Sequence, residues 1–142
     1  MDKPQAMVLE DSRAFTRFLT NVLEQFGFEV YNARSHAEFV PMMEQRNYDL
    51  AVLDWAIEGD KDGIYCISEI KRWDSYPSRT PTPILLLSGI DSRHGEKHAL
   101  NHGADAYLTK TEIEKDDLRT TILQIMEKVN PHRIPEGIKN SE

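Results

Sequence analysis

The sequence predicts an α/β fold in which helices cover both faces of a five-stranded parallel sheet. Short apolar runs alternate with longer amphipathic stretches along the chain, and this alternation is typical of repeated strand–helix units. The run at residues 49–54 has no polar alternation, as expected of a strand that helices cover on both sides. We therefore expect this run near the centre of the sheet.

Each expected strand is an apolar run that ends at a polar or charged residue. The predicted strands are, in chain order, residues 6–9, 28–33, 49–54, 84–89 and 105–109. Apolar side chains spaced by three and four residues predict helices after each strand. These helices are expected at residues 12–26, after 35, after 63, at 92–102 and from 111 to about 129.

Capping residues define several helix ends. Gly27 follows the first helix, where a glycine adopts the left-handed conformation of a C-terminal cap. Ser35 and Glu38 have the spacing of a capping box at the start of the second helix. We expect Pro41 to shorten or kink that helix, and we expect the segment from Thr111 to Glu114 to cap the last one.

Size and composition indicate one globular domain. The chain has 142 residues, of which 39% are hydrophobic and 29% charged, enough for a continuous core. The net charge of -7 argues against direct binding of nucleic acid. No apolar stretch approaches the roughly 20 residues that span a bilayer, and the N-terminus lacks the pattern of a signal peptide. We therefore expect a cytoplasmic protein with no membrane contact.

The last residues fall outside the repeating pattern. Pro131 and Pro135 end the helical periodicity, and the residues around them are polar. We therefore expect a domain at residues 1–129, followed at 130–142 by a polar tail. This tail is interpreted either as a free terminus or as the start of a linker to an output domain.

Two kinds of metal-ligating side chain occur away from the strand ends. The one cysteine, Cys66, lies on the expected apolar side of a helix, so we interpret it as a core residue rather than a reactive thiol. His94, His98 and His102 are spaced by four residues and would line one helix face. Their polar neighbours favour a solvated face over a metal site.

Five polar side chains stand where predicted strands end: Glu10, Asp11, Asp54, Ser88 and Lys110. The carboxyl ends of parallel strands meet at one edge of a sheet, where ligands bind. Carboxylates brought together there repel one another unless a cation lies between them. Mg²⁺, which prefers oxygen ligands, and the lysine would be those cations.

These residue types suit phosphoryl transfer. A free oxygen of Asp54 could attack phosphorus and form an acyl phosphate. Asp11 and Asp54 could ligate Mg²⁺, with Glu10 holding a metal-bound water. Lys110 and the Ser88 hydroxyl could each contact a phosphoryl oxygen.

In order and separation these residues resemble the receiver domain of two-component response regulators, over about residues 5–129. The resemblance implies a doubly wound, flavodoxin-like sheet with strand order 2-1-3-4-5. It implies that Asp54 is the phosphoacceptor and that Ser88 and Tyr107 form a switch pair. The implied Mg²⁺ site consists of Asp11, Asp54 and the backbone carbonyl of Ala56, with Glu10 acting through a bound water.

The resemblance also implies partners and a mode of action. A histidine kinase or a histidine phosphotransfer protein would supply the phosphoryl group, and the domain would catalyse its own phosphorylation and dephosphorylation without being an enzyme toward other substrates. Phosphorylation would change the face formed by the fourth helix, fifth strand and fifth helix. That face would contact an output domain or a downstream protein, or form a phosphorylation-dependent homodimer.

Three features depart from the usual family pattern. The acidic pair is Glu10-Asp11, where two aspartates are commoner. The loop that follows Asp54 lacks a Met-Pro step and is slightly longer than usual. Thr111 replaces a proline after Lys110, and because a cis peptide without proline costs about 3 kcal/mol or more, the cis bond common at this position is disfavoured here.

Other readings of the same residues remain. The domain could have kept the fold as a binding module, a pseudo-receiver that no longer cycles phosphate. An aspartyl phosphohydrolase is the third reading, but such enzymes generally need a second aspartate two residues beyond the nucleophile, where this chain has Ala56. Tyr107 is equally consistent with a half-buried packing ring and with a moving switch.

Overall fold

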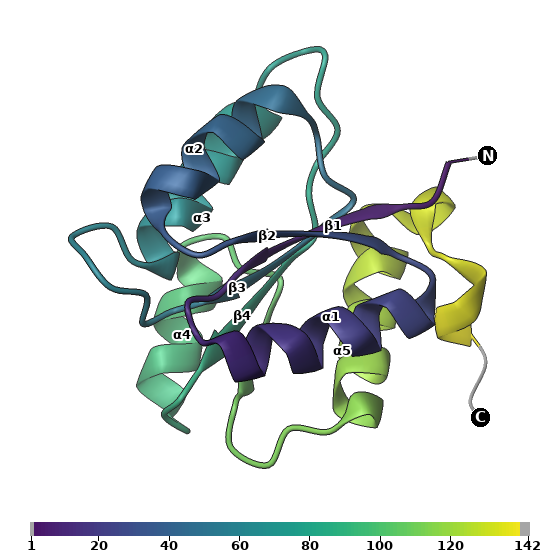
Figure 1. Ribbon diagram of the computed structural model, residues 1–142. Helices are drawn as coiled ribbons and strands as arrows, with labels where there is room; N and C mark the ends of the chain where they lie inside the picture. Colours follow the sequence, from purple (N-terminus) through teal and green to yellow (C-terminus); the bar gives the residue numbers. More distant parts are fainter. Residues whose placement is uncertain (1, 140–142) are drawn as a thin grey trace.

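The computed structural model describes residues 2–139 and has a five-stranded parallel sheet between two layers of helices (Figure 1). The strand order is β2-β1-β3-β4-β5, as the resemblance implied. The strands are β1 (Gln5–Leu9), β2 (Glu29–Ala33), β3 (Leu50–Asp54), β4 (Ile84–Ser88) and β5 (Ala106–Thr109). The helices are α1 (Arg13–Phe26), α2 (His36–Gln45), α3 (Gly63–Asp74), α4 (Arg93–Asn101), α5 (Lys115–Val129) and the short 3-10 helices η1 (Pro131–Arg133) and η2 (Glu136–Lys139).

Two hydrophobic cores lie on the two faces of the sheet. One core joins the sheet to α1 and α5 through side chains such as Leu23 and Ile122. The other joins it to α2, α3 and α4 through side chains such as Phe39, Ile67 and Ala99. Every residue of β3 and of β4 is buried, which confirms the prediction for the third strand and explains its continuous apolar run.

The predicted caps hold at the first two helices. Gly27 has a φ of 106°, in the left-handed region. The Ser35 hydroxyl accepts a hydrogen bond from the Glu38 amide at 3.3 Å. The Glu38 carboxylate accepts one from the amide of Arg34, one residue earlier than the usual capping box. Pro41 lies within the ten-residue α2.

The N-cap of the last helix is Glu114, the last residue of the segment expected to cap it, and not Thr111. α5 begins at Lys115, not near Thr111, and the amide of Glu114 donates to the Asp117 carboxylate at 2.8 Å. Glu112, which lies between Thr111 and Lys115, has a φ of 60°. This left-handed residue interrupts any helix begun at Thr111, because a right-handed helix needs negative φ at every position.

Residues 131–139 form η1 and η2, where the sequence predicted a polar tail. Ile138 is fully buried in the core beneath α1 and α5. The Arg133 guanidinium donates to the Asp49 carboxylate at 2.9 Å and so holds this segment beside the start of β1 (Figure 1). The end of the predicted tail, 140–142, lies outside the described residues, and the domain division at residue 129 stays a prediction.

In the part of the chain that the structure describes, no helix combines the length and the apolar character needed to cross a bilayer.

Candidate functional site

The strand order brings the predicted carboxylates together. β1 and β3 are neighbours, and Leu9 pairs with Leu53, so Glu10 and Asp54 leave the sheet side by side. Each of Glu10, Asp11 and Asp54 offers a carboxylate oxygen within 4.8 Å of the other two. Glu10 and Asp54 are 1% and 5% exposed, whereas Asp11 is half-buried. The cluster is thus buried on one side and reachable from solvent on the other.

Lys110 reaches this cluster from the edge of the sheet. Its backbone amide donates to the Ser88 carbonyl at 2.7 Å, which fixes the residue directly after β5. Its ammonium lies 2.8 Å from the Glu10 carboxylate and 3.5 Å from that of Asp54. The same ammonium lies 4.4 Å from the centre of the Phe15 ring, an attractive cation–π arrangement.

Burial and nearby charges shift the pKa values of Glu10 and Lys110. Desolvation is the largest effect on Glu10 and raises its pKa, and the negative charge of Asp54 adds to the rise, while the hydrogen bond from Lys110 opposes it. Desolvation lowers the pKa of Lys110, but the hydrogen bond to Glu10 and the charge of Asp54 outweigh it, so that the lysine pKa is raised. Three carboxylates thus lie together beside one ammonium.

The loop after β3 packs tightly against Asp54. The Asp54 carboxylate accepts a hydrogen bond from the Ala56 amide at 3.3 Å, and the amide of Gly63 donates to the Trp55 carbonyl at 3.0 Å. A Cβ atom at Gly63 would lie 2.5 Å from the Asp54 carbonyl oxygen, so this close approach requires glycine. Ala56 is exposed, and its carbonyl as a metal ligand stays a prediction.

Ser88 and Tyr107 border one pocket beside the acidic cluster. The pocket has a volume of about 430 Å³ and includes both residues together with Trp55 and Gly95 in its lining. The Ser88 hydroxyl accepts from the Ile90 amide at 3.1 Å, and the Tyr107 hydroxyl donates to the Ile90 carbonyl. Tyr107 is half-buried, an arrangement that fits a packing ring and a switch residue equally well.

Trp55 is a neighbour of the site that sequence reasoning missed. Its ring stacks on His98, with centroids 5.7 Å apart and an interplanar angle of 11°, and meets the Tyr107 ring edge-on at 6.3 Å. The loop thereby contacts α4. Its one sequence signal is the position next to Asp54. His98 and His102 also have adjacent rings, and the predicted solvated face of α4 agrees with the exposure of His94, His98 and His102.

The acidic cluster fits a hard divalent cation. Its three oxygen donors converge within 4.8 Å, and one of them is a carboxylate whose pKa burial has raised. A cation between the carboxylates would offset their mutual repulsion. Oxygen donors with no nitrogen or sulfur ligand are the set that Mg²⁺ and Ca²⁺ prefer.

Fold and site together define a doubly wound α/β domain with an acidic cluster, a hydroxyl residue and a lysine at the carboxyl edge of its sheet. The family model described as "Response regulator receiver domain" matches residues 6–123. The chain therefore belongs to the receiver domain family of two-component response regulators, as the sequence motifs indicated.

Named relatives agree with this membership. The chain is 31% identical over 134 residues to the phosphate regulon transcriptional regulatory protein PhoB of Shigella flexneri, a match that covers 94% of this chain and 56% of the relative. It is 32% identical over 104 residues to the KDP operon transcriptional regulatory protein KdpE of Escherichia coli, covering 73% and 43%. The chain thus spans about half the length of these curated relatives.

Solved structures show the same fold. The receiver domain of the Francisella response regulator 1452 superposes with a TM-score of 0.76 at 25% identity, covering 89% of this chain and 98% of that one. A Burkholderia pseudomallei response regulator, crystallised with a phosphorylated aspartic acid, a calcium ion and citrate, has a TM-score of 0.74 at 23% identity, covering 92% and 72%.

Proposed function

We propose that this receiver domain accepts a phosphoryl group on Asp54 from a phosphohistidine of a histidine kinase or a histidine phosphotransfer protein. One observation carries the proposal. The Asp54 carboxylate converges with two further carboxylates and lies 3.5 Å from the Lys110 ammonium. The Lys110 ammonium and a metal ion bound by the three carboxylates would together offset the charge of an anionic phosphoryl group. The buried Asp54 carboxylate is then suited to attack that group.

The transfer replaces a phosphorus–nitrogen bond of the donor with a phosphorus–oxygen bond to Asp54. A carboxylate oxygen of Asp54 forms a bond to phosphorus while the phosphorus–nitrogen bond of the donor imidazole breaks, and the leaving nitrogen takes a proton from solvent. Lys110 faces one oxygen of Asp54 and the Ala56 amide faces the other. The lysine would neutralise a phosphoryl oxygen, and Ser88 would donate its hydroxyl proton to another.

Glu10, Asp11, Asp54 and the Ala56 carbonyl are the residues proposed to hold Mg²⁺. When bound, the cation would neutralise phosphoryl oxygens and the carboxylates around them. The Burkholderia relative holds calcium and a phosphorylated aspartic acid in its crystal structure. We propose the same combination of a divalent cation and a phosphorylated aspartate for this chain. Glu10 already accepts hydrogen bonds from Lys110 and from the Ser12 amide, so we assign it to the metal through a bound water.

Phosphorylation is proposed to act through Ser88 and Tyr107. Both border one pocket with Trp55, and movement of Ser88 toward a phosphoryl group would change its contact with the Ile90 amide. The affected face is formed by α4, β5 and α5. Its proposed partners are an output domain, a downstream protein or a second phosphorylated copy, with no direct contact to nucleic acid by this domain, and we place the domain in the cytoplasm.

Intact-mass analysis tests the phosphoacceptor. Incubation with acetyl phosphate and Mg²⁺ should add one phosphoryl group to the wild-type chain and none to Asp54→Asn. The matched control is Asp60→Asn, which removes an exposed carboxylate from the neighbouring loop and should label like the wild type. Equal labelling of the wild type and Asp54→Asn would contradict the proposal.

A pseudo-receiver that binds a partner without cycling phosphate is the second candidate. The observation that favours it is the preference of the Lys110 ammonium for Glu10, at 2.8 Å, over Asp54, at 3.5 Å. Beryllofluoride with Mg²⁺ separates the two functions, because a phosphate-cycling site should show a saturable change and a pseudo-receiver should show none.

A further inference from the structure

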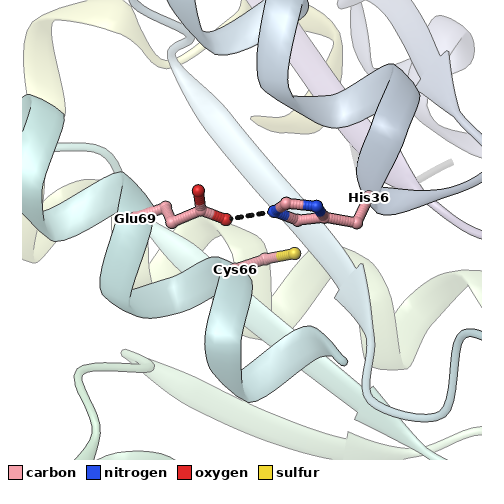
Figure 2. Close-up of side chains that lie close together, drawn as sticks. All are labelled: His36, Cys66 and Glu69. Carbon is pink, nitrogen blue, oxygen red and sulfur yellow. Dashed lines mark hydrogen bonds and ion pairs between the residues drawn. The ribbon is translucent and has the colours of Figure 1, made fainter. Parts of the chain in front are cut away.

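A second cluster of metal-ligating side chains lies between α2 and α3, made by residues that the phosphoryl site does not use. His36 is the first residue of α2, and Cys66 and Glu69 lie one turn apart on α3. Figure 2 shows the three side chains directed toward one another. The His36 Nε2 and Glu69 Oε1 atoms are 2.6 Å apart, and the ligand atoms of all three residues lie within 4.8 Å of one another.

We propose that His36, Cys66 and Glu69 form a binding site for Zn²⁺. An imidazole nitrogen, a thiolate sulfur and a carboxylate oxygen are the three ligand types that zinc accepts, whereas Mg²⁺ and Ca²⁺ take oxygen ligands. Bond lengths of about 2.0–2.3 Å to zinc place tetrahedral ligand atoms roughly 3.3–3.8 Å apart. The His36 Nε2 and Glu69 Oε1 atoms, now 2.6 Å apart, would separate by roughly 0.7–1 Å around the ion.

The surroundings of the cluster suit a site with one open position. Cys66 is fully buried, while the side chains of His36 and Glu69 are 24% and 17% exposed. An ion can therefore enter from the surface between the two helices and keep a water as its fourth ligand. The rings of Phe39 and Tyr65 lie 6.1 Å and 5.6 Å from the His36 ring and restrict its orientation.

The Cys66 thiol must lose its proton when its sulfur binds a metal ion. Burial first, and then the negative charges of Glu69 and Asp62, raises the pKa of Cys66 to about 12. On binding, Zn²⁺ would lose coordinated waters, the sulfur–hydrogen bond would break with the proton passing to solvent, and a sulfur–zinc bond would form. The sulfur ligand distinguishes this site from the acidic cluster, whose ligands are all oxygen atoms.

Cobalt absorption provides the test, because a thiolate bound to Co²⁺ gives a charge-transfer band that oxygen ligands do not. The metal-free full chain is titrated with Co²⁺ in excess Mg²⁺, which occupies the acidic cluster. We expect the band to saturate at an equimolar ratio and to disappear when equimolar Zn²⁺ is added. No band in the wild type would overturn the proposal.

Variants assign the ligands. Cys66→Ala should abolish the band, and His36→Gln and Glu69→Gln should each weaken Zn²⁺ binding roughly tenfold or more in calorimetric titrations. The last two side chains are partly exposed, so their test does not depend on a core substitution. Asp60→Asn and His98→Gln, both at exposed positions, are the controls and should bind like the wild type. Unchanged zinc affinity in both glutamine variants of the cluster would overturn the proposal.

Discussion

Lys110 is paired first with Glu10 and second with Asp54, at 2.8 Å and 3.5 Å. The other oxygen of the Glu10 carboxylate accepts the Ser12 amide at 2.9 Å. An aspartate at this position would have a side chain shorter by one methylene. The glutamate thus places a carboxylate directly against the lysine, and the ionisation of Glu10 becomes part of the stability of the domain.

The raised pKa of Glu10 predicts a pH dependence of stability. Because desolvation raises the pKa in the folded state above the ordinary value of 4.5, the folded protein holds this proton more tightly than the unfolded chain does. The favourable contribution is complete below pH 4.5 and is lost as pH rises through the folded pKa. Glutamine has no carboxyl proton to release, so the free energy of unfolding of Glu10→Gln should not show this fall as pH rises. Urea unfolding of metal-free protein between pH 4 and 7 measures it.

The control for this series is Glu44→Gln, which changes an exposed carboxylate on α2. Its free energy of unfolding should follow the wild type at each pH. A constant difference between the wild type and Glu10→Gln across the range would contradict the prediction.

Mg²⁺ is expected to stabilise the folded domain. A cation at 100 times its dissociation constant adds about 2.7 kcal/mol to the free energy of unfolding, which corresponds to a rise in melting temperature of roughly 5–10 °C for a domain of this size. Asp11→Asn should lose most of the rise, because it removes the half-buried carboxylate of the cluster. Thermal melts with and without Mg²⁺ measure it, and an equal rise in the variant would rule out the assigned ligand.

Gly63→Ala should destabilise the domain by about 1–3 kcal/mol, the usual cost of overpacking. The new Cβ would lie 2.5 Å from the Asp54 carbonyl oxygen and 2.9 Å from the Trp55 Cα atom, both of which are backbone. Gly89→Ala is the matched control, since no atom lies within 4 Å of a Cβ there. Urea unfolding compares the two, and equal stabilities would show that the loop yields without cost.

Ile138→Ala should lower the free energy of unfolding by about 2–5 kcal/mol, as expected for a large side chain removed from a core. Ile138 is fully buried against the core beneath α1 and α5. Its exposed neighbour Lys139 supplies the control, because Lys139→Ala should change stability by no more than about 0.5 kcal/mol. A small effect at Ile138 would mean that η2 is not part of the folded core.

Trp55 should report occupancy of the phosphoryl site. The sequence has two tryptophans, so Trp73→Phe leaves Trp55 as the fluorophore. Beryllofluoride with Mg²⁺ should change its emission saturably, because Trp55 follows Asp54 directly and contacts Tyr107 and His98. Adding Asp54→Asn should remove the change. A response that survives this second substitution would come from elsewhere in the chain.

The strands and the acidic cluster were predictable because their signals are local. Each strand is an apolar run, and parallel pairing brings the ends of neighbouring strands to one edge. Each predicted strand differs from the observed one by one residue at one end, as usual for element boundaries. The roles assigned to Asp54, Ser88 and Tyr107 stay predictions until the phosphorylation experiments are done.

Features that depend on distant contacts were not predictable. η1 and η2 are held by Arg133 on Asp49 and by the burial of Ile138, and a polar sequence with two prolines shows neither contact. The cluster of His36, Cys66 and Glu69 arises from the packing of α2 against α3. The late start of α5 follows from the left-handed Glu112, which Thr111 and its neighbours do not reveal.

Lys110, whose ammonium contacts the acidic cluster, directly follows β5, a strand at the edge of the sheet. β5 is hydrogen-bonded to β4 and forms one end of the sheet, and its four residues are half-buried, whereas those of β3 and β4 are all buried. Amide hydrogen exchange should therefore be faster in β5 than in the strands that carry the carboxylates. Brief opening of this edge would withdraw the lysine while the carboxylates keep their places, so that the charge balance at Asp54 depends on the local stability of one short strand.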